Sequence, residues 1–164
     1  MVELFVTVVI IGILLAVSAM AIGRAQRAKS QTVCAVNLRS ISQAFQSYMM
    51  DNGGRYPQPS TAAQWEDLLR TYVHRLTFRC PGDQELFPAV GSSYDWRDTA
   101  DPDCSLAGRM YTEVGRANIS LSYDALPGWH VPGKLQVVKI DGSVRLLADE
   151  PFLFELQTPV TSGP

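Results

Sequence analysis

The residues of this chain whose types suit chemistry are its three cysteines, its two histidines and a group of four aspartates. Cys80 and His130 would together make a nucleophile and its base, because an imidazole beside a thiol favours the reactive thiolate. A cysteine followed by a proline in a turn is more often structural, and neither histidine lies in a recognised catalytic signature. We therefore expect no enzymatic activity.

Cys80 also has a candidate partner for a disulfide. Cys80 and Cys104 both lie in the later, more polar part of the chain. An extracytoplasmic location would permit a disulfide between them, whereas free buried thiols are the alternative. The spacing of the two cysteines leaves both alternatives open.

The four aspartates lie in one stretch rich in glycine, serine and proline. Calcium binds in flexible cages of about six to eight oxygen ligands, which such a loop can supply. Their spacing differs from that of an EF-hand, and a solvated acidic loop is the alternative. The candidate calcium ligands are Asp95, Asp98, Asp101 and Asp103.

The first element of the chain carries one acid and then no charge. Glu3 precedes residues 4–23, which contain no charged side chain, and Arg24 ends the run. A helix needs about 20 apolar residues to cross a bilayer, so the run predicts a membrane-spanning helix. A carboxylate at the edge of such a helix is expensive to bury unless it is paired with a cation.

Two general classes of segment also fit this apolar run. Residues 19–21 match the small-x-small pattern of a cleavable signal peptide, but no basic residue precedes the run, as such a peptide requires. An ordinary single-pass anchor is the other class. The basic residues Arg24, Arg27 and Lys29 would then favour a cytoplasmic C-terminal part.

An amphipathic stretch continues the apolar run without a helix breaker. Its apolar residues recur at steps of four and three, which places them on one stripe of a helix. These residues are Cys34, Leu38, Ile41, Phe45 and Tyr48. The sequence at 51–54, Asp-Asn-Gly-Gly, then predicts the end of the helix. One helix of about 50 residues would be about 75 Å long, so its second half is expected to pack on a soluble head.

Three segments of the chain resemble known families. Glu3 and the leucine-rich, β-branched run at 8–16 resemble the N-terminal segment of type IV pilins and type II secretion pseudopilins. The sequence at 51–57, Asp-Asn-Gly-Gly-Arg-Tyr-Pro, resembles the junction that follows the long helix in major pseudopilins, with one extra glycine. Two further motifs resemble a branch of pilin-like proteins that has a Cys-Pro-x-Asp turn and a His-x9-Asp-Gly hairpin. The first is matched by Cys-Pro-Gly-Asp at 80–83. The second is matched by His130 and the Asp-Gly at 141–142, with a spacing one residue longer.

The resemblance implies a role for the helix and for its acid. In the family the helix is both a membrane anchor and the core of a filament, and the acid at Glu3 would neutralise the N-terminal amine of a neighbouring subunit. The implied location is the bacterial inner membrane, crossed once, with an extracytoplasmic head. The implied partners are copies of the chain or other pilin-like subunits, the inner-membrane assembly platform and the lipid bilayer. Where a basic leader precedes the chain, prepilin peptidase and N-terminal methylation are implied as well.

The remaining pattern predicts an α+β head with a small antiparallel sheet. A helix is expected over residues 61–73, and strands over 119–123, 135–140 and 143–148, the last two joined by a type I′ turn at Asp141-Gly142.

The predicted units are 1–23 for the transmembrane and assembly helix, 24–52 for its amphipathic continuation, 53–156 for the head and 157–164 for a flexible tail. The net charge of −2 gives no reason to expect a nucleic-acid partner. The expected function is that of a filament subunit; the alternative is a monomeric membrane-anchored binding module outside the cytoplasm.

Overall fold

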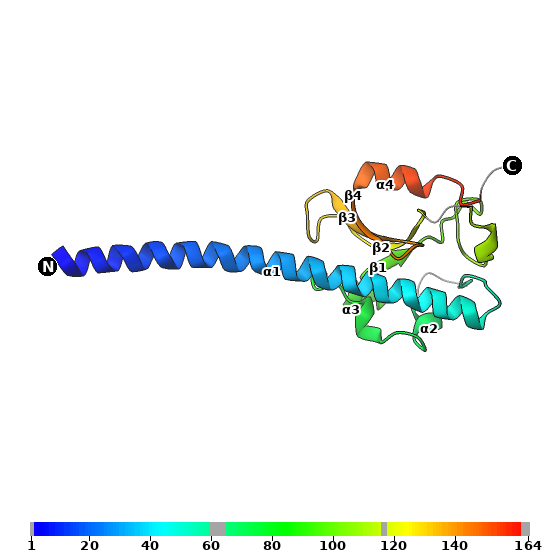
Figure 1. Cartoon of the computed structure of the whole chain (residues 1–164), viewed down its shortest axis with the longest axis horizontal. Helices are drawn as coiled ribbons and strands as arrows, with labels where there is room; N and C mark the ends of the chain where they lie inside the picture. Colours follow the sequence, from blue (N-terminus) through cyan, green and yellow to red (C-terminus); the bar gives the residue numbers. More distant parts are fainter. Residues whose placement is uncertain (1, 60–64, 116–117, 162–164) are drawn as a thin grey trace.

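The computed structural model describes residues 2–59, 65–115 and 118–161. It is an α+β protein in which a long N-terminal helix packs on an open four-stranded antiparallel sheet, as predicted (Figure 1). The helices are α1 (Val2–Asp51), α2 (Trp65–Leu69), η2 (Arg75–Phe78), α3 (Leu86–Val90), η3 (Tyr111–Glu113) and α4 (Asp149–Leu156). The strands are β1 (Tyr94–Trp96), β2 (Ser120–Asp124), β3 (Lys134–Lys139) and β4 (Val144–Ala148).

Helix α1 divides into a bare half and a packed half. The bare half, residues 2–22, is exposed along its whole length and projects away from the head (Figure 1). It is long and apolar enough to cross a membrane, and none of its apolar window is buried. The packed half lies against the head and buries Cys34, Leu38, Ile41 and Phe45 completely. The predicted stripe is therefore confirmed as the core-facing side of α1.

The end of α1 depends on two glycines in succession. Gly53 and Gly54 have φ values of 64° and 79°, in the left-handed region that glycine enters without steric cost. The Gly54 N–H donates to the Met49 carbonyl at 2.8 Å, which closes the last turn of the helix. The extra glycine of the junction therefore has a structural use, because the turn that reverses the chain contains two left-handed residues.

The sheet lies between α1 and α4. Its strands follow the order β1-β2-β3-β4, and every neighbouring pair is antiparallel. Along β3 the buried side chains alternate, so that Val138 joins the core beneath α1, whereas Leu135 and Val137 join Phe152 of α4. The first core also contains Phe45, Tyr56, Trp65, Phe78 and Trp96.

The predicted hairpin is confirmed, but its turn has another form. β3 and β4 pair in register from Lys134↔Ala148 to Val138↔Val144. The Gly142 N–H donates to the Lys139 carbonyl, and Gly142 has a φ of 79°. Among the described residues every positive φ belongs to a glycine, so Asp141 does not adopt the type I′ conformation. The connection is instead a type I turn followed by a left-handed glycine.

Two elements of the head were not predicted. Strand β1 forms inside the stretch that contains the four aspartates, where the sequence predicts a loop, and α4 forms over a segment that contains Pro151. Pro151 lies in the first turn of α4, where the missing N–H removes no helical hydrogen bond. Asp149 and Glu150 also favour this helix start, because acids are stabilised at the positive end of the helix dipole.

Residues 157–161 of the predicted flexible tail contact the head in this structure. Val160 is fully buried, and Thr161 forms an isolated β-bridge with Val114. The buried Arg97 guanidinium donates to the Glu155 carbonyl at 2.9 Å and to the Thr158 carbonyl at 2.6 Å. An arginine that satisfies the carbonyls at the end of α4 holds the following chain in place. Residues 162–164 of the predicted tail, and 61–64 of the predicted helix 61–73, lie outside the described residues.

Candidate functional site

A disulfide joins Cys34 to Cys80, with their Cα atoms 5.4 Å apart. The candidate disulfide between Cys80 and Cys104 is therefore not formed, because Cys80 pairs with Cys34 instead. Cys34 lies on the buried face of α1, and η2, which packs against α1, brings Cys80 to it. Cys104 is a free buried thiol whose Sγ donates to the Gln157 carbonyl at 3.1 Å, on a different segment. Spacing along the chain gave no information about this pairing because α1 and η2 meet only in the folded head.

His130 and Asp124 complete a cluster around the disulfide. The Nε2 atom of His130 lies 3.1 Å from Cys80 Sγ, and one potential ligand atom from each of Cys34, Cys80, Asp124 and His130 lies within 4.8 Å of the others. We call these four residues the Cys–His–Asp cluster. They come from α1, the turn after η2, the last residue of β2 and the loop between β2 and β3. That loop lies at the end of the head from which the bare half projects (Figure 1).

The turn that presents Cys80 is held by the carboxylate of Asp83. The Asp83 N–H donates to the Cys80 carbonyl at 3.0 Å. The carboxylate accepts a hydrogen bond from the Ser93 hydroxyl at 2.6 Å and three from the backbone N–H groups of Glu85, Leu86 and Phe87. Burial opposes the charged form, but these hydrogen bonds outweigh it and hold the pKa of Asp83 below its usual value. The Cys-Pro-x-Asp sequence therefore encodes a rigid turn.

Gly82 of the same turn allows the loop that carries His130 to come close. A Cβ atom at Gly82 would lie 3.0 Å from Trp129 Cβ and 3.2 Å from His130 Cε1. The first distance is shorter than ordinary packing allows, so any side chain at this position would displace the loop. The absence of a side chain at Gly82 thus leaves room for His130 beside Cys80.

Burial moves both titratable groups of the cluster toward their neutral forms. Asp124 is 1% exposed, and burial raises the pKa of its carboxyl to about 7, although the Gln136 N–H donates to Oδ2 at 2.9 Å. Burial lowers the pKa of His130. Within the part of the chain that the structure describes, neither Asp124 Oδ1 nor His130 Nδ1 has a hydrogen-bond partner. The cluster therefore contains two buried polar atoms whose bonding capacity is unused.

The chemistry available to the cluster depends on the state of the sulfurs. In the structure Cys80 Sγ is bonded to Cys34, so Cys80 and His130 do not form a free thiolate and base. Thiolate sulfur, imidazole nitrogen and carboxylate oxygen are nevertheless all donors that bind zinc in proteins. Cys34 and Asp124 were not predicted as members of the cluster. The one signal for Cys34 was its place on the apolar stripe, and Asp124 had none.

The four aspartates predicted as calcium ligands do not converge. Asp95 belongs to β1, where burial raises its pKa, and burial together with the nearby charge of Asp95 raises the pKa of Asp98 to about 6. Asp101 Oδ1 accepts the Asp103 N–H at 2.9 Å, and Asp103 lies 3.8 Å from the Arg109 guanidinium. Over residues 2–59, 65–115 and 118–161, the group of three or more potential ligands within mutual reach is the Cys–His–Asp cluster. Calcium at the aspartates stays a prediction.

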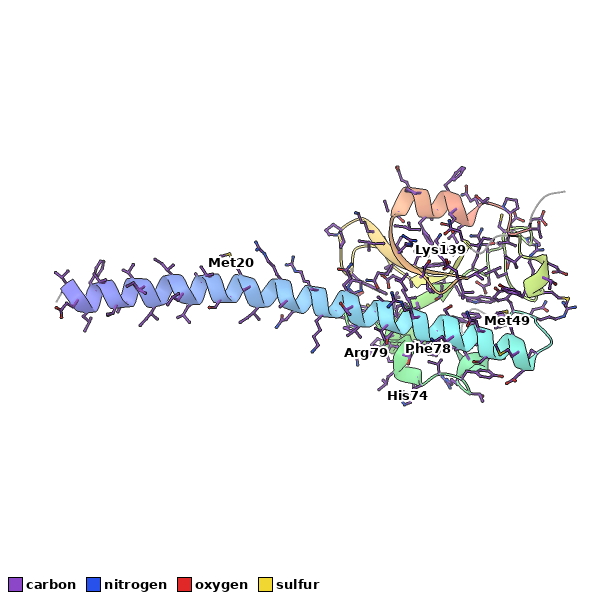
Figure 2. All side chains as sticks on the ribbon, viewed as in Figure 1. Met20, Met49, His74, Phe78, Arg79 and Lys139 are labelled. Atoms are coloured by element: carbon purple, nitrogen blue, oxygen red, sulfur yellow. A yellow bond between two sulfur atoms is a disulfide. The ribbon has the colours of Figure 1, made fainter. Side chains whose placement is uncertain are left out.

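Glu3 lies in the first turn of α1 on the bare half. Its side chain is exposed, as are those around it, and Figure 2 shows side chains, with Met20 among them, on all sides of this half. The structure thus presents Glu3 as an accessible acid at the start of an apolar rod. Its predicted role toward a neighbouring amine stays a prediction.

The arrangement of a long apolar N-terminal helix on a small antiparallel sheet is consistent with a pilin-like fold. No family model matches the chain, and comparison with curated proteins and with solved structures likewise gives no match.

Proposed function

We propose that this chain is a structural subunit of a type IV pilus-like or type II secretion pseudopilus filament, which polymerises through the bare half of α1. The observation that carries the proposal is the exposure of that half. Leu4 is 72% exposed and Leu15 is 66% exposed, on a helix that is continuous with the core of the head. Burying apolar surface is worth about 25 cal/mol per Å², so the bare half requires lipid or other subunits around it.

Glu3 would give specificity to the association of bare halves. Lipid tails cover an apolar helix as well as another helix does, so the hydrophobic effect alone does not favour association within a bilayer. A carboxylate in that environment is strongly destabilised until a cation pairs with it. The N-terminal amine of an adjacent subunit is such a cation, and pairing with it would fix the offset between neighbours.

The proposed location is the bacterial inner membrane, with the head outside the cytoplasm. The Cys34–Cys80 disulfide supports an extracytoplasmic head, because disulfides persist mainly in oxidising compartments. The proposed partners are like subunits, the lipid bilayer and an inner-membrane assembly platform, with prepilin peptidase where a leader precedes the chain. The role is mechanical rather than enzymatic.

Replacing Glu3 with leucine tests the proposal. We expect Glu3→Leu to abolish filaments, because the charge pair between neighbours is lost, while the chain still inserts in the membrane with a folded head. Electron microscopy of sheared filaments and cross-linking of membrane-embedded chains measure the two steps. Glu85→Leu, at an exposed acid of the head, is the matched control and should assemble normally.

Two results of this experiment would contradict the proposal. Filaments of normal number and length from Glu3→Leu would remove the assembly role of the acid. A parent chain that remains monomeric in the membrane when expressed with a complete assembly platform would instead favour a membrane-anchored binding module.

A further inference from the structure

We propose that the Cys–His–Asp cluster binds one Zn²⁺ ion when its two cysteines are reduced. Cys34 and Cys80 would supply thiolates, His130 an imidazole nitrogen and Asp124 a carboxylate oxygen. This inference goes beyond the proposed filament role and does not depend on it, because the cluster lies wholly within one chain.

The positions of the donor atoms suit a tetrahedral ion. Zinc binds thiolate sulfur at about 2.3 Å and nitrogen or oxygen at about 2.0–2.2 Å, so neighbouring donors of a tetrahedral site lie roughly 3.3–3.8 Å apart. In the cluster all four donors lie within 4.8 Å of one another, and Cys80 Sγ is 3.1 Å from His130 Nε2. Once the bond between Cys34 and Cys80 is broken, the two sulfurs must separate to about 3.8 Å for the donors to reach the distances of a closed site.

Unused bonding capacity inside the cluster is the second, independent observation. Asp124 is 1% exposed, yet its Oδ1 atom has no hydrogen-bond partner among the described residues. Buried polar atoms are almost always satisfied, so this exception requires an explanation. A cation bound by the Asp124 carboxylate beside the two sulfurs would provide it.

Groups around the cluster would orient its ligands. The Gln136 N–H donates to Asp124 Oδ2 at 2.9 Å, and the Gln136 side chain in turn donates to the Gln31 carbonyl of α1 at 2.9 Å. The Gly82 N–H donates to Cys80 Sγ at 3.4 Å, a contact that stabilises a thiolate. Partners of this kind raise metal affinity by fixing the ligands before the ion arrives.

Zinc binding and the disulfide are mutually exclusive states of the same sulfurs. Two equivalents of a low-molecular-weight thiol reduce the Cys34–Cys80 bond, giving two protein thiols and the disulfide of the reductant. Zn²⁺ then displaces the two thiol protons and binds both thiolates. In reverse, a small disulfide oxidises the two thiolates, is itself reduced to two thiolates, and releases Zn²⁺.

Both states connect the same segments of the molecule. Cys34 belongs to α1, whereas Cys80, Asp124 and His130 belong to the head, beside the point where the bare half leaves it. The disulfide fixes α1 at one position of the head, and zinc would fix it at three. The junction between helix and head would therefore stay closed under reducing conditions as well as oxidising ones.

The test uses the full chain in detergent micelles, with Cys104→Ser so that the remaining thiols belong to the cluster. The chain is reduced with a monothiol, desalted without oxygen, equilibrated with Zn²⁺ and desalted again, and its zinc content is measured by mass spectrometry. We expect about one zinc per reduced chain and none in the disulfide form. Oxidised glutathione should release the ion, and Co²⁺ in its place should show thiolate-to-cobalt charge-transfer absorption.

Two variants separate loss of the site from loss of the fold. Asp124→Asn and His130→Ala retain both cysteines, so circular dichroism of their disulfide forms shows whether each head is folded. In the reduced state both should bind zinc at least about tenfold more weakly in competition with a chromophoric chelator. Asp103→Asn, an exposed acid outside the cluster, should bind like the parent.

The proposal fails under either of two results. A reduced parent chain that retains no more zinc than the Cys34→Ser/Cys80→Ser double variant would overturn it. So would parental zinc affinity in both Asp124→Asn and His130→Ala.

Discussion

The two halves of α1 have the same backbone conformation and opposite surroundings. The bare half exposes every side chain from residue 2 to residue 22, whereas the packed half buries a stripe from Cys34 to Met49. α1 therefore keeps the same helical conformation both where it packs on the head and where it does not. The packed half supplies part of the core of the head, whereas the side chains of the bare half do not pack against the head.

The source of helical stability therefore changes along one element. An isolated helix in water is marginal, so the packed half depends on its contacts with the sheet and with η2. The bare half is rich in β-branched residues, which are poor helix formers in water. In an apolar medium it would stay helical because unpaired backbone groups are too costly there. Each half is suited to a different solvent.

Phe45→Ala should have the largest effect on the head. Phe45 is fully buried, with ring centroids 5.8 Å from Trp65 and 5.1 Å from Trp96. Deleting the ring leaves a cavity in the main core, and we expect a loss of about 3–5 kcal/mol in the free energy of unfolding. Chemical denaturation followed by tryptophan fluorescence measures it.

The matched control is Leu14→Ala on the bare half. Leu14 is 61% exposed, so its removal should change unfolding of the head by no more than about 0.5 kcal/mol. A loss similar to that of Phe45→Ala would show that the two halves of α1 are energetically coupled.

Loss of the disulfide should have the next largest effect. Cys34 and Cys80 are separated by 46 residues, and cutting the bond frees the unfolded chain to explore more conformations. Reduction in the presence of a zinc chelator should lower the free energy of unfolding by about 2–4 kcal/mol. Cys104→Ser, which affects only the free thiol, is the control and should remain close to the parent. A reduced, metal-free head as stable as the oxidised one would mean that this bond does not hold α1 to the head.

Titration of Glu66 should change the stability of the head only as the pH changes. Burial is the main cause that raises the pKa of Glu66 from 4.5 to about 7, and its Oε2 atom has no hydrogen-bond partner among the described residues. The folded state thus binds the proton more tightly than the unfolded state. The stabilisation is complete below about pH 4.5 and is lost as the pH rises through about 7.

Glu66→Gln should therefore reduce the decrease in the free energy of unfolding between about pH 5 and about pH 8. Relative to the parent, the variant should be more stable at the upper pH than at the lower. Denaturation at both pH values measures the difference, with Glu85→Gln at an exposed acid as the control. An unchanged slope would mean that Glu66 is charged in the folded head.

The part of the fold that follows local periodicity was predictable. The stripe of α1 and the β3–β4 hairpin both follow from spacing along the chain, and both are confirmed. β1 was not predictable because its three residues pair with β2 only through contacts distant in sequence. Nor was α4, because a proline in the first turn obscured a helix that it tolerates.

The site was predictable only in fragments. Cys80 and His130 could be selected as candidates from their residue types alone. The residues beside them in the structure are Cys34, on α1, and Asp124, at the end of β2. The four residues come from segments that meet only in the folded head, so their spacing along the chain does not reveal the site. In the acidic stretch, Asp101 and Asp103 are close in sequence and take part in local turn and surface contacts, and calcium binding there stays a prediction.

The absence of a break in α1 has a geometric consequence. A straight helix turns by about 100° and advances by about 1.5 Å with each residue. If the bare half shifted by one residue along a fixed neighbour, the whole head would swing through about that angle. The contacts of the bare half with its neighbours therefore determine the rotation of the head about the axis of α1, although the head lies several nanometres away.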